Sequence, residues 1–162
     1  MPTGPSKTRF RASLLDRLLD ATPRQRREVH PLRTQDSKTL RAAVARDLGW
    51  LLNTRTPLDG PEFDRRELTV IDFGIPDFGG LSPENPADRR SMARRIARAI
   101  TAFEPRLASV RVTIAPHMAA ERGLEAFIEA ELAVETHREP VAFRTVFQQR
   151  NGMVEIHDDL DG

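Results

Sequence analysis

The sequence contains no cysteine among its 162 residues. Disulfides, thiolate nucleophiles and cysteine-based zinc or iron–sulfur sites are therefore excluded. No apolar run approaches the roughly 20 residues that a membrane-spanning helix needs. The N-terminal stretch MPTGPSKTRFRASLLDRLLD is interrupted by charged residues and lacks the apolar core of a signal peptide. We therefore expect a cytoplasmic protein with no membrane insertion.

The motifs of common catalytic and cofactor sites are also missing. The four histidines have no partner at metal-binding spacing, and the chain has no glycine-rich nucleotide loop and no GxSxG nucleophile motif. Basic and acidic residues number 25 and 24, so the net charge of +1 gives no overall field that attracts nucleic acid. We expect no metal, no cofactor and no nucleic-acid partner. The histidines are His30, His117, His137 and His157.

Residues 1–35 are predicted to form a mobile N-terminal arm, and residues 36–162 the folded domain. Apolar residues recur at helical spacing over about 10–20, with Leu14, Leu15 and Leu18 on one face. A helix of about ten residues is too short to be stable alone in water, and a polar stretch separates it from the domain. We therefore expect this helix to dock on a partner protein.

Two longer helices are predicted inside the domain. The first begins at Asp36 or Ser37, which can cap it, and runs to about Asn53. The second begins near Pro86, because proline is tolerated in the first turn, and ends near Phe103. Between them, residues 68–73 predict a short strand and residues 74–80 a loop. The predicted buried faces are Leu40, Val44, Leu48, Leu51 and Leu52 in the first helix, and Met92, Ile96, Ala99, Ile100 and Phe103 in the second.

The last third of the chain changes from helical to alternating periodicity. Apolar and polar residues alternate over 110–114, 126–134 and 141–147, and a short fourth run covers 153–156. The fold class is therefore α+β, with N-terminal helices packed on a C-terminal antiparallel meander of three to four strands. The run AFIEAELAVE has alternating acidic residues, and we expect it to keep its backbone available for another chain's strand.

The tripeptide Glu104-Pro105-Arg106 lies between the second helix and the sheet. Pro105 ends the helix and makes the corner stiff. Two interpretations stay open for the flanking charges. Glu104 and Arg106 either project together toward a partner, or form an intramolecular ion pair that closes the helix end.

Two rival functions also have sequence support. Glu104 is the best single candidate for a catalytic acid in a peptidoglycan-cleaving enzyme, although no second carboxylate is marked. Alternatively, Arg90, Arg94 and Arg98 lie on one helix face and could bind a phosphate backbone, as in a nucleic-acid-binding adaptor.

Five segments taken in order resemble a known family. They are SLLDRLLD at 13–20, RDLGWLLNTR at 46–55, VIDFGIPDFGG at 70–80, FEPRL at 103–107 and PVAFRTVF at 140–147. Together they resemble the baseplate wedge family of contractile injection machines, also called the lysozyme-like phage-tail family. The early SLLDRL segment is similar to the TssE subunits of bacterial type VI secretion systems.

The resemblance implies a non-enzymatic α+β subunit of a cytoplasmic baseplate. It implies assembly with the wedge proteins TssF and TssG, and a contact with the sheath proteins TssB and TssC that helps to start sheath polymerisation. The family's interaction motif corresponds to Glu104, Pro105 and Arg106. The family also implies that sheath strands join the edge of the sheet.

Overall fold

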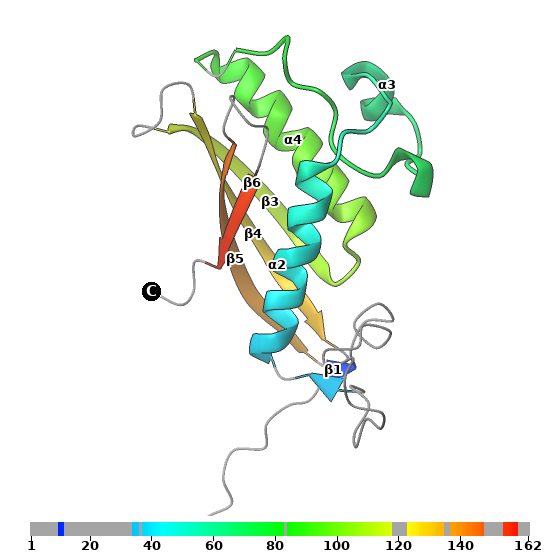
Figure 1. Ribbon diagram of the computed structural model, residues 1–162, viewed down its shortest axis with the longest axis vertical. Coiled ribbons are helices and arrows are strands. Elements are labelled where there is room, and N and C mark those ends of the chain that lie inside the picture. The colour runs from blue at the N-terminus through cyan, green and yellow to red at the C-terminus, as the bar shows by residue number, and fades with distance from the viewer. Residues whose placement is uncertain are drawn as a thin grey trace, which may run out of the picture. The chain divides into compact units, whose positions relative to one another are not determined.

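A computed structural model describes residues 10–11, 34–35, 37–82, 84–117, 123–134, 137–147 and 154–158 (Figure 1). The chain divides into two compact units, residues 1–43 and 44–162. This division falls inside helix α2 (Ser37–Asn53), eight residues after the predicted end of the arm.

The first unit holds two short strands. β1 (Phe10–Arg11) pairs antiparallel with β2 (Thr34–Gln35). Phe10 and Arg11 are therefore not in the helix predicted over about 10–20, because they pair with a distant segment that local periodicity cannot reveal. The remainder of that helix, with Leu14, Leu15 and Leu18, lies outside the described residues.

Both long helices are confirmed. α2 covers Ser37–Asn53 and α4 covers Pro86–Phe103. The Asn85 side chain caps α4 by accepting a hydrogen bond from the Ala87 N–H at 2.9 Å. None of the described helices is long and apolar enough to cross a membrane. The predicted apolar faces are buried apart from Phe103, which is half-buried.

The segment between these helices differs from the prediction. Helix α3 (Gly60–Arg65) was not predicted; Asp59 caps it, and its Phe63 is fully buried. The strand predicted over 68–73 is wrong, because Val70–Asp72 form the 3₁₀ turn η1. The Asp72 carboxylate closes this turn by accepting hydrogen bonds from the Thr69 N–H at 2.9 Å and the Thr69 hydroxyl at 2.8 Å.

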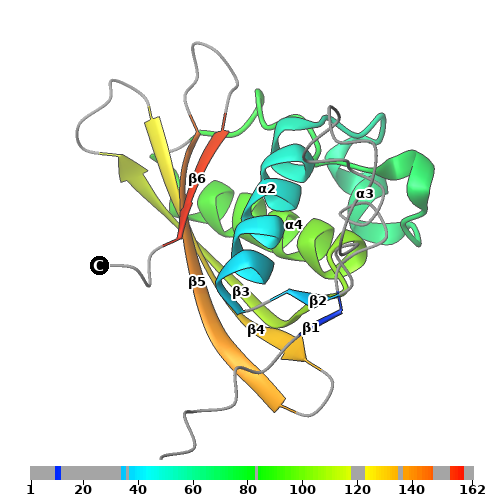
Figure 2. The ribbon, with the colours of Figure 1, turned by 60° about the horizontal axis from the view of Figure 1, so that its bottom comes forward.

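The predicted meander is confirmed, and with it the α+β fold. Strands β3 (Leu107–His117), β4 (Gly123–Val134), β5 (His137–Phe147) and β6 (Val154–Asp158) pair antiparallel in that order. α4 packs along β3, and Figure 2 shows α4 and the C-terminal half of α2 on the same side of the sheet. Alternate residues of β4 and β5 face the helices and are buried: Ala126, Ile128, Ala130, Leu132, Val141, Phe143 and Thr145.

One expectation about the sheet is overturned. The run AFIEAELAVE belongs to β4, which pairs with β3 on one side and β5 on the other, so its backbone is not available to another chain. Two carboxylates of β4 pair across the strands instead: Glu131, inside the run, with Arg138 at 2.8 Å, and Glu125, just before it, with Arg144 at 3.1 Å. The outermost strands of the described sheet are β3 and β6.

The closure of η1 by Asp72 predicts an acid-dependent loss of stability. The hydrogen bonds from the Thr69 backbone and hydroxyl lower the pKa of Asp72 below its usual 3.8; burial opposes this and the charge of Arg66 adds to it. Because the folded pKa is lower, the unfolded chain binds the proton first as the pH falls. The stabilisation is therefore complete above pH 3.8 and is lost below it, toward the folded pKa.

We therefore expect Asp72→Asn to be less stable than the wild type at neutral pH. The difference in free energy of unfolding should shrink once the pH falls below 3.8. Urea unfolding of both proteins at a series of pH values measures this. A difference that stays constant across the series would show that the Asp72 charge does not hold the turn.

Candidate functional site

The turn between α4 and β3 places the Glu-Pro-Arg tripeptide. The Glu104 N–H still donates to the Ile100 carbonyl at 2.8 Å, and the Leu107 N–H donates back to the Glu104 carbonyl at 3.0 Å. Pro105 lies at the exposed tip of this tight turn, between the two hydrogen-bonded residues. We call the residues Glu104, Pro105 and Arg106 the corner.

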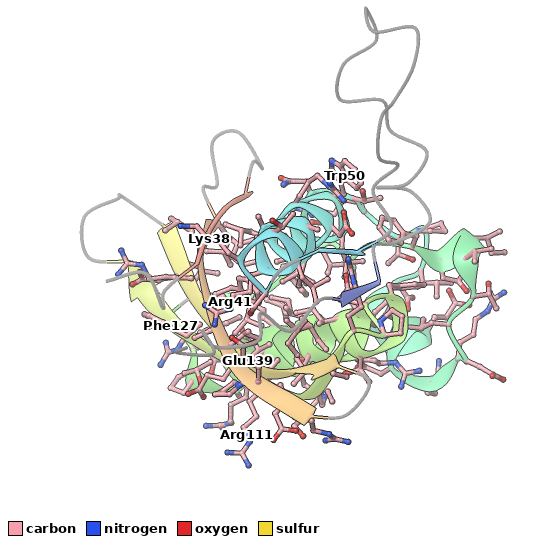
Figure 3. The ribbon with its side chains drawn as sticks, turned by 90° about the horizontal axis from the view of Figure 1, so that it is seen from below. Lys38, Arg41, Trp50, Arg111, Phe127 and Glu139 are labelled. Atoms are coloured by element: carbon pink, nitrogen blue, oxygen red, sulfur yellow. The ribbon has the colours of Figure 1, made fainter. Side chains whose placement is uncertain are left out.

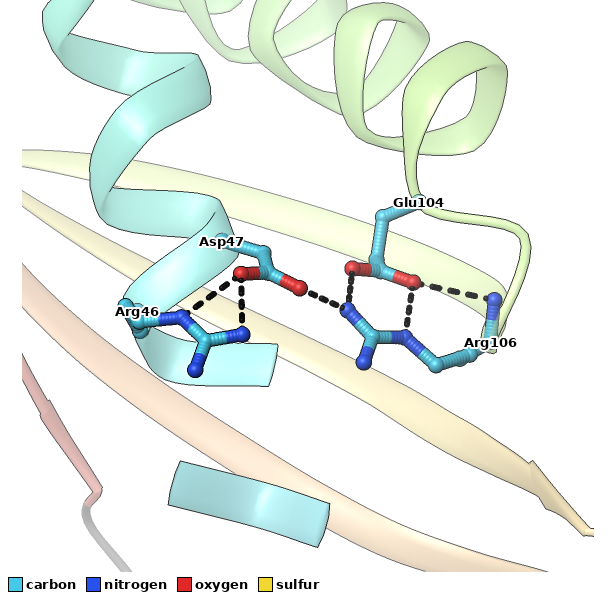
Figure 4. Close-up of polar contacts among 4 residues, drawn as sticks. All are labelled: Arg46, Asp47, Glu104 and Arg106. Atoms are coloured by element: carbon cyan, nitrogen blue, oxygen red, sulfur yellow. Dashed lines mark hydrogen bonds and ion pairs between the residues drawn. The ribbon is translucent and has the colours of Figure 1, made fainter. Parts of the chain in front are cut away.

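The side chains of the corner bind each other (Figure 4). The Nε of Arg106 donates to Glu104 Oε1 at 2.6 Å, its Nη2 donates to Oε2, and its backbone N–H donates to Oε1 at 3.1 Å. Glu104 is only 4% exposed. A carboxylate that lies inside the protein thus has a bidentate guanidinium partner two residues away, the strongest geometry for such a pair.

The same guanidinium also reaches helix α2. Nη2 of Arg106 donates to Asp47 Oδ2 at 2.5 Å, and Asp47 accepts a second hydrogen bond from its neighbour Arg46 at 3.0 Å. Burial lowers the pKa of Arg106, but the hydrogen bonds and charges of Glu104 and Asp47 outweigh it, so the pKa lies above its usual value. Arg106 therefore stays charged and ties α2 to the end of α4.

The structure thus contains the intramolecular ion pair, one of the two interpretations open from the sequence. Glu104 and Arg106 do not project freely from the corner; the exposed side chain there is Pro105. Sequence reasoning missed Asp47, which is 59 residues from Arg106. A weak signal existed, because Asp47 lies three residues after Val44 and four before Leu51 on the buried side of its helix.

The carboxylates are poorly placed for catalysis. Asp47 is the second carboxylate that the sequence did not mark, but it and Glu104 both accept hydrogen bonds from the same guanidinium. Their oxygens are thus engaged by the protein's own donors and not directed at a substrate. Within the described part of the chain, no group of three His, Asp or Glu side chains could hold a metal ion.

The predicted arginine face is divided. Arg90 and Arg94 are exposed, whereas Arg98 donates to the Arg66 carbonyl at 2.5 Å and lies 6.0 Å from the centre of the Phe63 ring. Another exposed cation, Arg111, projects from the opposite face of the sheet from the helices (Figure 3). Of the three predicted arginines, Arg98 is thus engaged by groups of the protein itself, and Arg90 and Arg94 remain exposed.

The family model for the baseplate wedge protein gp25 matches residues 38–137, more than half of the chain. The chain belongs to this family. Its members are structural components of phage-tail-like baseplates, and the match runs from α2 into β5. It includes Asp47 and the whole corner but not Leu14, Leu15 or Leu18. A comparison with curated protein sequences found no match.

The network predicts that Arg106 stabilises the free protein. Arg106→Ala should lower the free energy of unfolding by about 3–5 kcal/mol, because it leaves the buried Glu104 without its counter-charge. Arg138→Ala is the control: its pair with Glu131 is exposed, and its loss should cost about 0–1 kcal/mol. Urea unfolding measures the free energy of unfolding of both variants and of the wild type. Equal, small effects would mean that Arg106 does not hold the corner.

Proposed function

We propose that this chain is the TssE-type wedge subunit of a type VI secretion system and acts in the cytoplasm without catalysis. Its membership of the baseplate wedge family supports a structural role. The segment SLLDRLLD at 13–20, which is similar to TssE, supports the narrower assignment. The observation that carries the proposal is the corner. There the Glu-Pro-Arg motif forms a turn that hydrogen bonds of Arg106 hold in one conformation, with Pro105 exposed at its tip.

In this proposal the corner positions the chain against the wedge proteins TssF and TssG. Glu104 and Arg106 do not contact the partner themselves. Their charges neutralise each other, and their hydrogen bonds hold the turn in one conformation. The exposed Pro105 and the surface around it then make the contact. A rigid surface loses little conformational entropy on binding, which favours affinity.

The sheath proteins TssB and TssC would bind at the edge of the sheet by adding a strand. β3 is the outermost strand beside α4, and a cleft of about 310 Å³ lies between the two. Such a cleft has room for alternate side chains of an added strand. The residues that line it are Pro86, Arg89, Arg90, Ala93, Val112, Thr113 and Ile114. In the same proposal, the segment with Leu14, Leu15 and Leu18 docks on a baseplate neighbour.

The test is capture of partners by the tagged full chain from its native cells. The variant Glu104→Gln/Arg106→Gln should lose TssF, TssG and the sheath proteins. Asp64→Asn/Arg95→Gln is the matched control, because this carboxylate–arginine pair joins α3 to α4 at 3.0 Å and is similarly part-buried. The control should retain the partners, and both variants should first be shown to unfold cooperatively.

Two results would contradict the proposal. If the wild type captures none of these proteins, or captures nucleic acid or cell-wall fragments instead, the rival functions take its place. If the control variant loses the partners as completely as the corner variant, the corner is not the contact.

A further inference from the structure

Exposed apolar side chains gather in one short segment. The large hydrophobic residues exposed among the described side chains are Trp50, Val70, Ile71 and Phe73, and three of these four lie within 70–73. Val70 is 87% and Ile71 72% exposed. Two branched aliphatic side chains so fully exposed on one turn are not explained by the packing of this chain, and such clusters mark interaction sites.

The segment is held in place from both sides. At its start, the Asp72 carboxylate binds the backbone and hydroxyl of Thr69, the residue that precedes Val70. After it, Gly74 adopts a φ of +123°, and a Cβ atom there would lie 2.6 Å from the Thr54 carbonyl oxygen. The buried Ile75 then exchanges backbone hydrogen bonds with residues 54 and 56, at 3.0 and 3.1 Å. Val70 and Ile71 are thus displayed on an ordered base.

The exposed segment continues to the corner. The Phe73 ring lies edge-on against the Phe103 ring, with 5.3 Å between their centres, and Phe103 is the residue before Glu104. We call Val70, Ile71, Phe73 and Phe103 the apolar ridge. Because Phe103 adjoins the corner, a partner that covers Pro105 lies beside this end of the ridge.

The chain that leads into the ridge is basic. Arg65 and Arg66 end α3 just before the ridge and are exposed, whereas Glu67 is the one exposed carboxylate between them and η1. The Asp72 carboxylate interacts with the charge of Arg66, but it is buried and turned toward Thr69, so it is not itself exposed at the surface. A complementary surface therefore presents carboxylates to Arg65 and Arg66, beside an apolar centre.

We propose that the apolar ridge inserts into an apolar pocket, bordered by carboxylates, on the same wedge protein that covers the corner. This inference rests on the proposed function for the identity of the partner. It assigns the binding energy to Val70 and Ile71, and it assigns to the corner the task of holding the surface in place. A few buried side chains at the centre of an interface carry most of its affinity.

The experiment measures the affinity of the full chain for co-expressed, purified TssF–TssG. Val70→Ser/Ile71→Ser should weaken binding at least tenfold, because it removes both apolar side chains. Val70→Ile/Ile71→Val is the control; it exchanges the two side chains, keeps the composition and should bind within about twofold of the wild type. Both positions are exposed, so both variants should unfold like the wild type.

Charge reversal provides a second measurement. Arg65→Glu/Arg66→Glu should slow association with TssF–TssG and remove most of its dependence on salt. An unchanged rate and salt dependence would overturn the acidic border of the proposed pocket.

The outcomes separate this inference from the proposed function. If the wild type does not bind TssF–TssG, the proposed function fails and the inference falls with it. If the wild type and the serine variant bind equally, the inference alone is wrong. It is also wrong if sedimentation shows a wild-type dimer that the serine variant abolishes, or if phosphatidylglycerol vesicles bind the ridge, because the occupant is then a second copy or a lipid surface.

Discussion

One guanidinium joins the corner to helix α2. Arg106 binds Glu104 through two side-chain nitrogens and Asp47 through one of them, and so joins the end of α4 and the start of β3 to helix α2. A buried ion pair of this kind adds little to stability compared with apolar packing, but losing one partner is costly. Its main effect here is to allow a single arrangement of the corner, since the carboxylate at 104 is otherwise buried without a counter-charge.

This constraint separates the residues that hold the surface in shape from those that, in the proposed function, contact a partner. The side chains of Glu104 and Asp47 both accept hydrogen bonds from Arg106, inside the protein. The groups left outside are Pro105 and the exposed side chains of the ridge, Val70, Ile71 and Phe73, which the Asp72 turn and the backbone at Gly74 hold in place. A charged motif can therefore be required for assembly without touching a partner, because it fixes the shape that apolar residues present.

The sequence predicted the parts of the fold that depend on local signals. α2 and α4 follow from apolar spacing and from the proline at the start of α4, and the strands follow from alternation. Local patterns predicted the wrong structure where a contact with another residue or segment determines the conformation. LTVIDF has strand composition, but Asp72 turns it back on Thr69. β1 pairs with a segment more than 20 residues away, and the acidic run proved to be a central strand.

The candidate site divides in the same way. The tripeptide and its place between helix and strand were predicted from the sequence, and the ion pair was one of two interpretations. Asp47 was not predicted, because no local pattern joins residues 59 positions apart. The ridge was missed for a local reason: residues 68–73 were predicted to form a strand, so the exposure of Val70 and Ile71 emerged only with η1.

A double-mutant cycle between Asp47→Asn and Arg106→Met tests the central claim most directly. If the shared guanidinium ties α2 to the corner, the two substitutions together should destabilise the protein by less than the sum of their separate effects. The coupling should be about 0.5–3 kcal/mol in urea unfolding. Additive effects, with a coupling near zero, would contradict the account, because the corner would then be held without Asp47.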